Sequence, residues 1–185
     1  GLYALQDCTT GNSNSAFGLR SLENLTTGEY NCGYGRHTLQ ALTTGDQNTA
    51  LGNRAGYSQT TASANTWVGD HAGFTNTDGQ DNTGIGKYAL HLNTTGDKNV
   101  AVGKDAMVSN TTGEYNVAIG VDALQANTTA NENTAVGYYA LNLNTTGHSN
   151  TAVGYAALDM STTGDYNVAV GRNSLGANTT ADNNT

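Results

Sequence analysis

The sequence is poor in several residue types, and some of these shortages exclude classes of protein. Only 12% of the 185 residues are charged and 36% are hydrophobic, proline is absent, and the two cysteines are Cys8 and Cys32. Two cysteines cannot form a disulfide framework, and neither has the histidine or cysteine neighbours of a zinc site. We therefore expect two free thiols, no bound metal and no cofactor.

Basic residues are also scarce. Fifteen acidic residues against seven basic ones give a formal net charge of -8 and a pI near 4.6. This sign is wrong for a protein that binds the phosphate backbone, so nucleic acid is not an expected partner. No run approaches the roughly 18 apolar residues that would span a bilayer. We expect no membrane insertion of this segment.

Three residue types dominate instead. The chain has 29 threonines, 24 asparagines and 24 glycines, which together make up 77 of its 185 positions. All three are poor formers of helix interiors. A helical bundle or a helix-rich α/β enzyme is therefore excluded, and an all-β chain is expected.

A repeat of 17 residues runs through the whole chain. Glycine occupies every seventeenth position, without insertion, at Gly1, Gly18, Gly35, Gly52, Gly69, Gly86, Gly103, Gly120, Gly137, Gly154 and Gly171. Asparagine stands four positions before each glycine from Gly18 onward, and Asn184 continues this series. Both ends lie inside a repeat, so we expect residues 1–185 to be a single array of about eleven repeats, cut from a longer fibre.

We expect each repeat to form one coil of a parallel β-solenoid. With the repeat glycine as position 0, position −2 is mostly alanine, and position −1 is bulky and apolar in Phe17, Tyr34, Leu51, Val68, Ile85, Val102, Ile119, Val136, Val153 and Val170. Because side chains alternate along a strand, positions −1 and −3 share one face and positions −2 and 0 share the other. We predict that the bulky face points into the coil.

The rest of the repeat predicts a second strand and a turn. Leucine or methionine at position +4 would form a second inward column, and the Thr-Thr pair at +8 and +9 would close the coil. The glycine that usually follows this pair is replaced by Ala62, Ala130 and Ala181. The turn therefore does not require positive φ. The asparagines at −4 are expected to form an amide ladder along the rod.

The predicted core is thin, because each coil offers only about two large apolar side chains. Burying one stabilises the fold by about 1.5–3 kcal/mol, against about 1–2 kcal/mol for each residue that is ordered. A lone solenoid would be marginal. We predict self-association along the smooth face that carries alanine at −2 and glycine at 0.

Three copies of the motif carry a resemblance to known proteins. They read Asn-Thr-Ala-Val-Gly-Tyr at 150–155, Asn-Val-Ala-Val-Gly at 99–103 and Asn-Val-Ala-Ile-Gly at 116–120. The chain resembles the Asn-Ser-Val-Ala-Ile-Gly repeats of trimeric autotransporter adhesin heads and, more closely, the repeat arrays of phage tail-fibre-like proteins. The adhesin repeat is shorter, lacking the three residues near 144–146.

This resemblance covers the whole chain and carries several expectations. It implies a left-handed parallel β-roll in which three chains pack side by side as a homotrimer. It also implies an extracellular location on a cell or virion surface. The role would be that of a structural and adhesive fibre segment, a rigid spacer that recognises a host-cell receptor or glycan.

The segment 53–80 departs most from the repeat. Gly56 and Gly73 replace the inward leucine, aromatic residues follow both, and the only tryptophan takes the place of alanine at −2. One interpretation is local repacking, in which an aromatic side chain fills the missing volume. The other is a carbohydrate-binding platform formed by Tyr57, Trp67, His71 and Phe74.

Acidic residues recur at position +11, where Asp97 and Glu114 would lie about 5 Å apart on adjacent coils. That spacing suits the carboxylate pair of a retaining glycosidase or a calcium ion. Catalysis needs two unlike environments, whereas a solenoid repeats one, so we interpret these residues as solvated turn acids and the chain as not an enzyme. A glycan-cleaving solenoid enzyme remains an alternative.

Two further patterns allow other interpretations of the repeat. An ice-binding or crystal-surface-binding solenoid could use the threonine columns, although adjacent threonines point to opposite faces. One asparagine column begins Asn-x-Thr sequences at Asn93, Asn110, Asn127, Asn144 and Asn178. These residues are either glycan acceptors of a secreted chain or asparagines that favour a turn.

Overall fold

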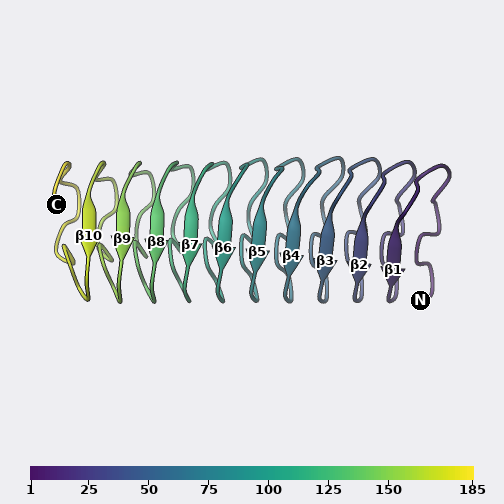
Figure 1. The fold of residues 1–185 in the computed structure, drawn as a ribbon, viewed down its shortest axis with the longest axis horizontal. Coiled ribbons are helices and arrows are strands. Elements are labelled where there is room, and N and C mark those ends of the chain that lie inside the picture. Colours follow the sequence, from purple (N-terminus) through teal and green to yellow (C-terminus); the bar gives the residue numbers. More distant parts are fainter.

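The chain winds into one parallel β-solenoid (Figure 1). The computed structural model describes residues 1–185. It contains no helix long and apolar enough to cross a membrane. Its ten strands are β1 (Ser15–Phe17), β2 (Cys32–Tyr34), β3 (Thr49–Leu51), β4 (Thr66–Val68), β5 (Thr83–Ile85), β6 (Val100–Val102), β7 (Val117–Ile119), β8 (Thr134–Val136), β9 (Thr151–Val153) and β10 (Val168–Val170).

The sheet topology follows directly from the repeat. The strands lie in sequence order from β1 to β10, and every pair is parallel. Each residue pairs with the residue 17 positions later, as Thr134 does with Thr151. The predicted fold, with one 17-residue repeat per coil, is confirmed.

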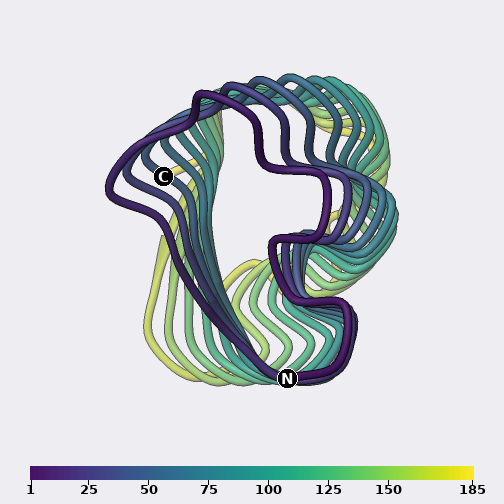
Figure 2. The ribbon, with the colours of Figure 1, turned by 90° about the vertical axis from the view of Figure 1, so that its right-hand side faces the viewer.

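The predicted second strand is wrong, because the residues after the repeat glycine form consecutive turns. Positions +2 and +4 adopt left-handed backbone conformations, with φ of 57° at Tyr139 and 50° at Leu141. Such residues lie outside the β region. Seen along its axis, each coil has a nearly straight side, where the strands lie, and a stepped side formed by these turns (Figure 2).

The orientation predicted for the strand is also wrong. At position −2, Ala118 and Ala135 are fully buried, whereas at position −1 Phe17 is 70% exposed and Val170 is 68% exposed. The interior opposite the strand is already filled: a Cβ placed on Gly33, at position −2, would lie 2.6 Å from Ser21 Oγ. In coils that carry leucine at position +4 only small side chains fit there, so the bulky side chains at position −1 face outward.

The leucine column at position +4 does point inward, as predicted. Its central members are fully buried: Leu22, Leu39, Leu90, Met107, Leu124, Leu141 and Leu158. They pack against two alanine columns, at −2 and +3, in a single core cluster of 23 residues. The core therefore consists of one large and two small apolar side chains in a typical coil.

The predicted asparagine ladder at position −4 is present. The main-chain N–H of Asn116 donates to Asn99 Oδ1 at 3.0 Å, and its Nδ2 donates to the same oxygen at 3.1 Å and to the Ala130 carbonyl at 2.8 Å. The asparagines at position −4 are all buried from Asn31 to Asn167. A buried amide needs a hydrogen-bond partner for each polar group. These asparagines find their partners in the adjacent coils, so the ladder joins neighbouring coils.

A second ladder lies at position +7. The buried side chain of Asn110 donates to Asn93 Oδ1 at 2.7 Å, and that of Asn127 donates to Asn110 Oδ1 at 2.8 Å. The first coils carry buried Leu25 and Leu42 in this column instead. The Asn-x-Thr asparagines of the central coils are therefore interior residues, inaccessible to a glycosylating enzyme in the folded chain.

The invariant glycine at position 0 satisfies two requirements. Gly137 has a φ of 138° and, if it carried a Cβ, that atom would lie 2.3 Å from the carbonyl oxygen of Gly154 in the next coil. The turn glycines at position +10 have no positive φ, which confirms the expectation from Ala62, Ala130 and Ala181. Of these two columns, only the one at position 0 requires glycine for its backbone conformation.

Replacing a position-0 glycine should destabilise the rod. For Gly137→Ala we expect a loss of about 1–3 kcal/mol from the backbone conformation alone, and more from the contact with the next coil. Gly176→Ala is the matched control, because φ is not positive there and its nearest contact from a Cβ is 3.2 Å. Urea unfolding at one fixed protein concentration measures both, and equal stability of the two variants would contradict this account.

Candidate functional site

A cluster of aromatic side chains lies on the stepped side of the rod. Positions +2 and +5 form two adjacent columns there, and the +5 column carries Tyr57, Phe74 and His91 on successive coils. The rings of Tyr57 and Phe74 are 5.2 Å apart with planes 8° apart, and Phe74 and His91 are also 5.2 Å apart, with planes 16° apart. Because coils repeat about every 4.8 Å, one column brings such rings into stacking contact.

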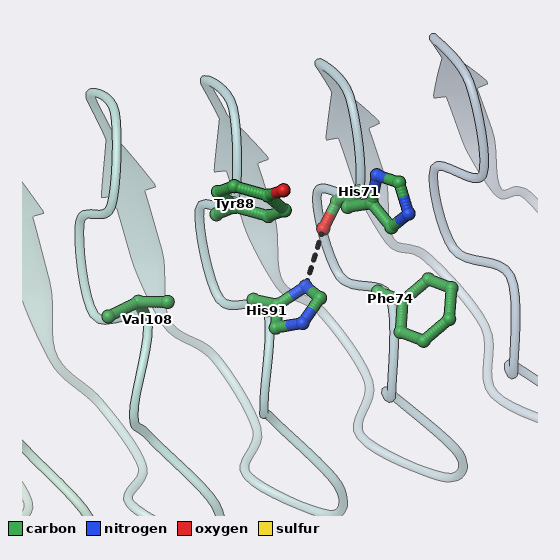
Figure 3. A pocket seen from close by; sticks show the side chains of 5 residues that line it. All are labelled: His71, Phe74, Tyr88, His91 and Val108. Carbon is green, nitrogen blue, oxygen red and sulfur yellow. Dashed lines mark hydrogen bonds between the residues drawn. The ribbon is translucent and has the colours of Figure 1, made fainter.

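Two side chains of the +2 column complete this cluster. The ring of His71 lies 5.0 Å from that of Phe74, and the ring of Tyr88 lies 5.1 Å from that of His91. Together with Val108, these four residues line an open pocket of about 470 Å³ (Figure 3). The pocket therefore spans three neighbouring coils.

A hydrogen bond orients one imidazole of the pocket, and the other lies beside a carboxylate. His91 Nδ1 lies 3.3 Å from the main-chain carbonyl oxygen of His71, which can only accept, so this nitrogen carries the proton (Figure 3). His71 Nδ1 lies 3.1 Å from Asp70 Oδ1, an electrostatic contact whose geometry is poor for a hydrogen bond. Of the two rings, that of His91 is thus held by a hydrogen bond, whereas His71 Nδ1 has no hydrogen-bond partner.

Asp70 carries a negative charge beside the pocket. The hydrogen bond donated by Asn53 Nδ2 at 2.9 Å is the main cause that lowers the pKa of Asp70, with a further contribution from His71, while partial burial opposes both. Asp70 is therefore ionised at neutral pH.

Trp67 lies inside the coil and not in the pocket. Its side chain is fully buried, and its Nε1 donates to Gln59 Oε1 at 2.9 Å. A Cβ added to Gly73 would lie 2.4 Å from Trp67 Cδ2, and one added to Gly56 would lie 2.7 Å from Cδ1. The indole fills the volume of two missing leucines, which supports the repacking interpretation.

The predicted platform is therefore corrected in part. Trp67 is wrong as a surface residue, because position −2 faces the interior. Tyr57, His71 and Phe74 do lie together, and Tyr57 extends the cluster by one coil beneath the guanidinium of Arg54, 5.8 Å from the ring centre.

Sequence reasoning missed three residues of the pocket. Tyr88, His91 and Val108 lie beyond the irregular segment 53–80, which contains all four residues of the predicted platform. They share columns +2 and +5 with His71 and Phe74. Comparing positions one repeat apart, rather than neighbours in sequence, is the signal that would have found them.

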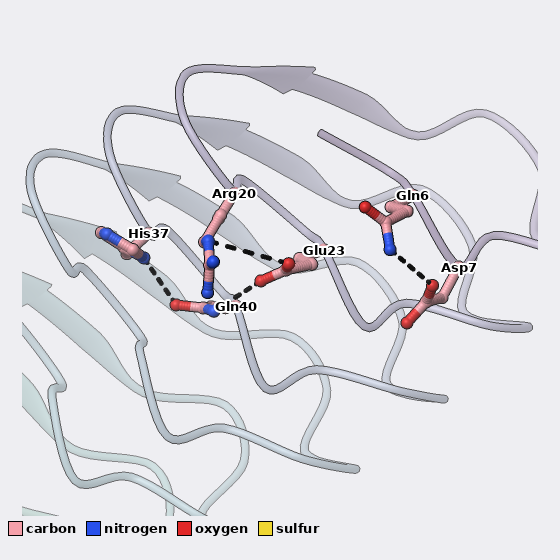
Figure 4. A network of polar contacts seen from close by, with 6 residues as sticks. All are labelled: Gln6, Asp7, Arg20, Glu23, His37 and Gln40. Carbon is pink, nitrogen blue, oxygen red and sulfur yellow. Dashed lines mark hydrogen bonds and ion pairs between the residues drawn. The ribbon is translucent and has the colours of Figure 1, made fainter. Parts of the chain in front are cut away.

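The same two columns are polar in the first coils. There Arg20 Nε contacts Glu23 at 3.8 Å, Gln40 donates to Glu23, and His37 Nδ1 lies 2.6 Å from Gln40 Oε1 (Figure 4). The first and last of these contacts lie within one coil, and the bond from Gln40 to Glu23 joins neighbouring coils. The aromatic pocket is thus a local feature of the central coils.

The acidic column at +11 has a structural role. Asp97 Oδ1 accepts the main-chain N–H of Gln80 at 2.7 Å, and Asp165 Oδ1 accepts that of His148 at 2.6 Å. No group of three or more histidine, cysteine or acidic side chains lies close enough together to hold a metal ion. These carboxylates satisfy amides of the preceding coil, so their recurrence has an explanation without catalysis.

A second exposed feature runs along the strands. We call the outward side chains at position −1 the outer stripe; its members are Phe17, Tyr34, Leu51, Val68, Ile85, Val102, Ile119, Val136, Val153 and Val170. Ile85 is 39% exposed and Ile119 is 41% exposed. Monomers rarely expose long contiguous apolar surfaces. The stripe therefore replaces the predicted alanine face, whose alanines are buried, as the candidate contact surface.

We expect that Trp67, Gly56 and Gly73 can be replaced together by the residues that other coils carry at these positions, alanine at −2 and leucine at +4. Trp67→Ala should cost about 3–5 kcal/mol, because it leaves a cavity. Adding Gly56→Leu and Gly73→Leu should restore most of this loss, since leucine occupies column +4 with a similar φ in other coils. Urea unfolding of the single and triple variants measures this coupling, and a triple variant no more stable than Trp67→Ala would refute it.

The chain matches no protein-family model, no curated protein and no solved structure. Its functional interpretation is therefore built on its own features. These are the repeat, the outer stripe on one side of the rod and the aromatic pocket on the other.

Proposed function

We propose that this chain is a structural and adhesive segment of an extracellular fibre, in which several copies of the rod associate side by side. The observation that carries this proposal is the outer stripe. Ten bulky apolar side chains, one from each strand, follow the rod for about 45 Å at the usual strand spacing. A surface of this length suits a partner that is itself a rod.

The thin interior supports the same conclusion. A typical coil buries one leucine and small residues, which leaves the isolated rod with few large apolar contacts. Most valines and isoleucines of the stripe are about 40% exposed or less, so burying the exposed part of each against a partner would add a corresponding fraction of the about 1.5–3 kcal/mol gained by a fully exposed side chain. Because the stripe repeats with the coils, every coil contributes to association.

Three copies around a common axis are the assembly that the resemblance to adhesin heads and tail-fibre-like proteins implies, with left-handed coils on a cell or virion surface. In such an assembly the strands would face the axis. The stepped sides, which lie opposite the strands in each coil (Figure 2), would face solvent. Contact between copies of the chain and recognition of a ligand would then use different sides of the rod. We assign no residue a catalytic role.

Binding to ice or to a crystal surface is the second candidate. The threonines at position +9, including Thr95, Thr112 and Thr146, are exposed and regularly spaced. Hydroxyls at position +8 are occupied, as Thr94 Oγ1 donates to the Thr111 carbonyl at 3.0 Å, whereas the +9 column is free except at Thr61, which donates to Asp78. Thermal hysteresis that is lost when these exposed threonines are made bulky would favour this candidate.

The oligomeric state tests the proposed fibre. We expect sedimentation equilibrium to give a mass near three times 19.1 kDa. Val102→Lys with Val136→Lys should reduce the mass to that of one chain, because two charges per copy would be buried in the contact.

Gln125→Lys, on the stepped side, is the control and should leave the mass unchanged. A wild-type chain that stays monomeric at the highest soluble concentration would overturn the fibre. The same holds if the two lysines leave the assembly intact.

A further inference from the structure

We propose that the pocket of His71, Phe74, Tyr88, His91 and Val108 binds a neutral pyranose ring of a glycan. This inference rests on the adhesive part of the proposed function, and it specifies the site and the class of ligand. Three of these five residues, Tyr88, His91 and Val108, lie outside the platform expected from sequence.

The lining of the pocket matches the two sides of a sugar ring. A pyranose presents C–H groups on one face and hydroxyl groups around its edge. The rings of Phe74 and Tyr88 and the side chain of Val108 offer apolar surface, while the Tyr88 hydroxyl and the two imidazoles offer donors and acceptors. The volume of about 470 Å³ falls within the range of small-molecule sites.

The charges around the pocket favour a neutral ligand. No lysine or arginine lines it, and the ionised Asp70 lies next to His71. Lys87 Nζ is 4.8 Å from the centre of the Tyr88 ring, an arrangement in which the ring itself attracts the cation. Asp70 and Lys87 both lie outside the lining and are of opposite charge, so the pocket offers a carboxylated or sulfated sugar no net positive charge.

One polar group of the pocket, the imidazole of His91, is oriented before a ligand arrives. The contact with the His71 carbonyl places the proton of His91 on Nδ1, which leaves Nε2 as an acceptor. From inside the coil, Trp67 packs against Gly73, the residue that precedes Phe74. Such support lowers the cost of ordering side chains on binding.

The position of the pocket leaves it free in the proposed fibre. It lies on the stepped side, with the strands behind it (Figure 3). Association through the outer stripe therefore does not cover it. The outer stripe contacts other copies of the chain in this fibre, whereas the pocket binds a different partner.

The test uses an array of immobilised neutral, sialylated and sulfated glycans, followed by calorimetry with the strongest neutral glycan. We expect Phe74→Ala and His91→Ala each to weaken binding at least about tenfold, as for a central contact residue. Gln125→Ala and Asn142→Ala are matched controls, since they lie in column +5 three coils beyond Phe74 and His91, respectively. Both controls should bind as the wild type does.

Three results would overturn the inference: no binding to any neutral glycan, binding confined to anionic glycans, or wild-type affinity in both pocket variants. Sedimentation of the same samples separates this failure from that of the fibre. A trimer that binds no neutral glycan removes the site alone. A monomer whose binding depends on Phe74 and His91 removes the fibre alone.

Discussion

The hydrogen bonds of the asparagine at position −4 set the geometry on which the rest of the rod depends. The side-chain oxygen of Asn116 accepts from the main chain and side chain of Asn133, while its nitrogen donates to Asn99 and to a turn carbonyl of the next coil. Each coil is thus tied to both neighbours at one fixed point. An insertion within a repeat would displace this point, which accounts for a period of 17 without exceptions. The close stacking that results leaves room only for glycine at position 0.

The repeat, the ladder and the leucine column could be predicted from sequence because each depends on which residues recur together. The direction in which the strand faces could not. Alternation shows that positions −1 and −2 lie on opposite faces, but the width of the interior decides which face is inside. That width is set by the turn residues opposite, such as Ser21 beside Gly33. The left-handed conformations at +2 and +4 likewise could not be predicted, because positive φ is uncommon for leucine and tyrosine.

The aromatic pocket shows how a repeating scaffold acquires a unique site. Stacking places equivalent positions of successive coils about 4.8 Å apart, so substitutions 17 or 34 residues apart in sequence become direct neighbours. Trp67 and its glycines repack the interior of the coils at which the pocket begins, while His71, Phe74, Tyr88 and His91 change the surface. The sequence indicated the irregular segment and three of the aromatic cluster's residues. The pocket also includes residues of the next two coils. These residues lie beyond the irregular segment in sequence, so only the stacking of the coils shows that they belong to the pocket.

The exchange of asparagine side-chain amide protons, measured by nuclear magnetic resonance, tests the central claim most directly. The account predicts slow exchange for the Nδ2 protons of Asn48, Asn116 and Asn150, which are buried and bonded between coils. The side-chain amides of Asn24 and Asn173, which are exposed, should exchange freely. Rapid exchange throughout the −4 column in a chain that remains folded would contradict the account.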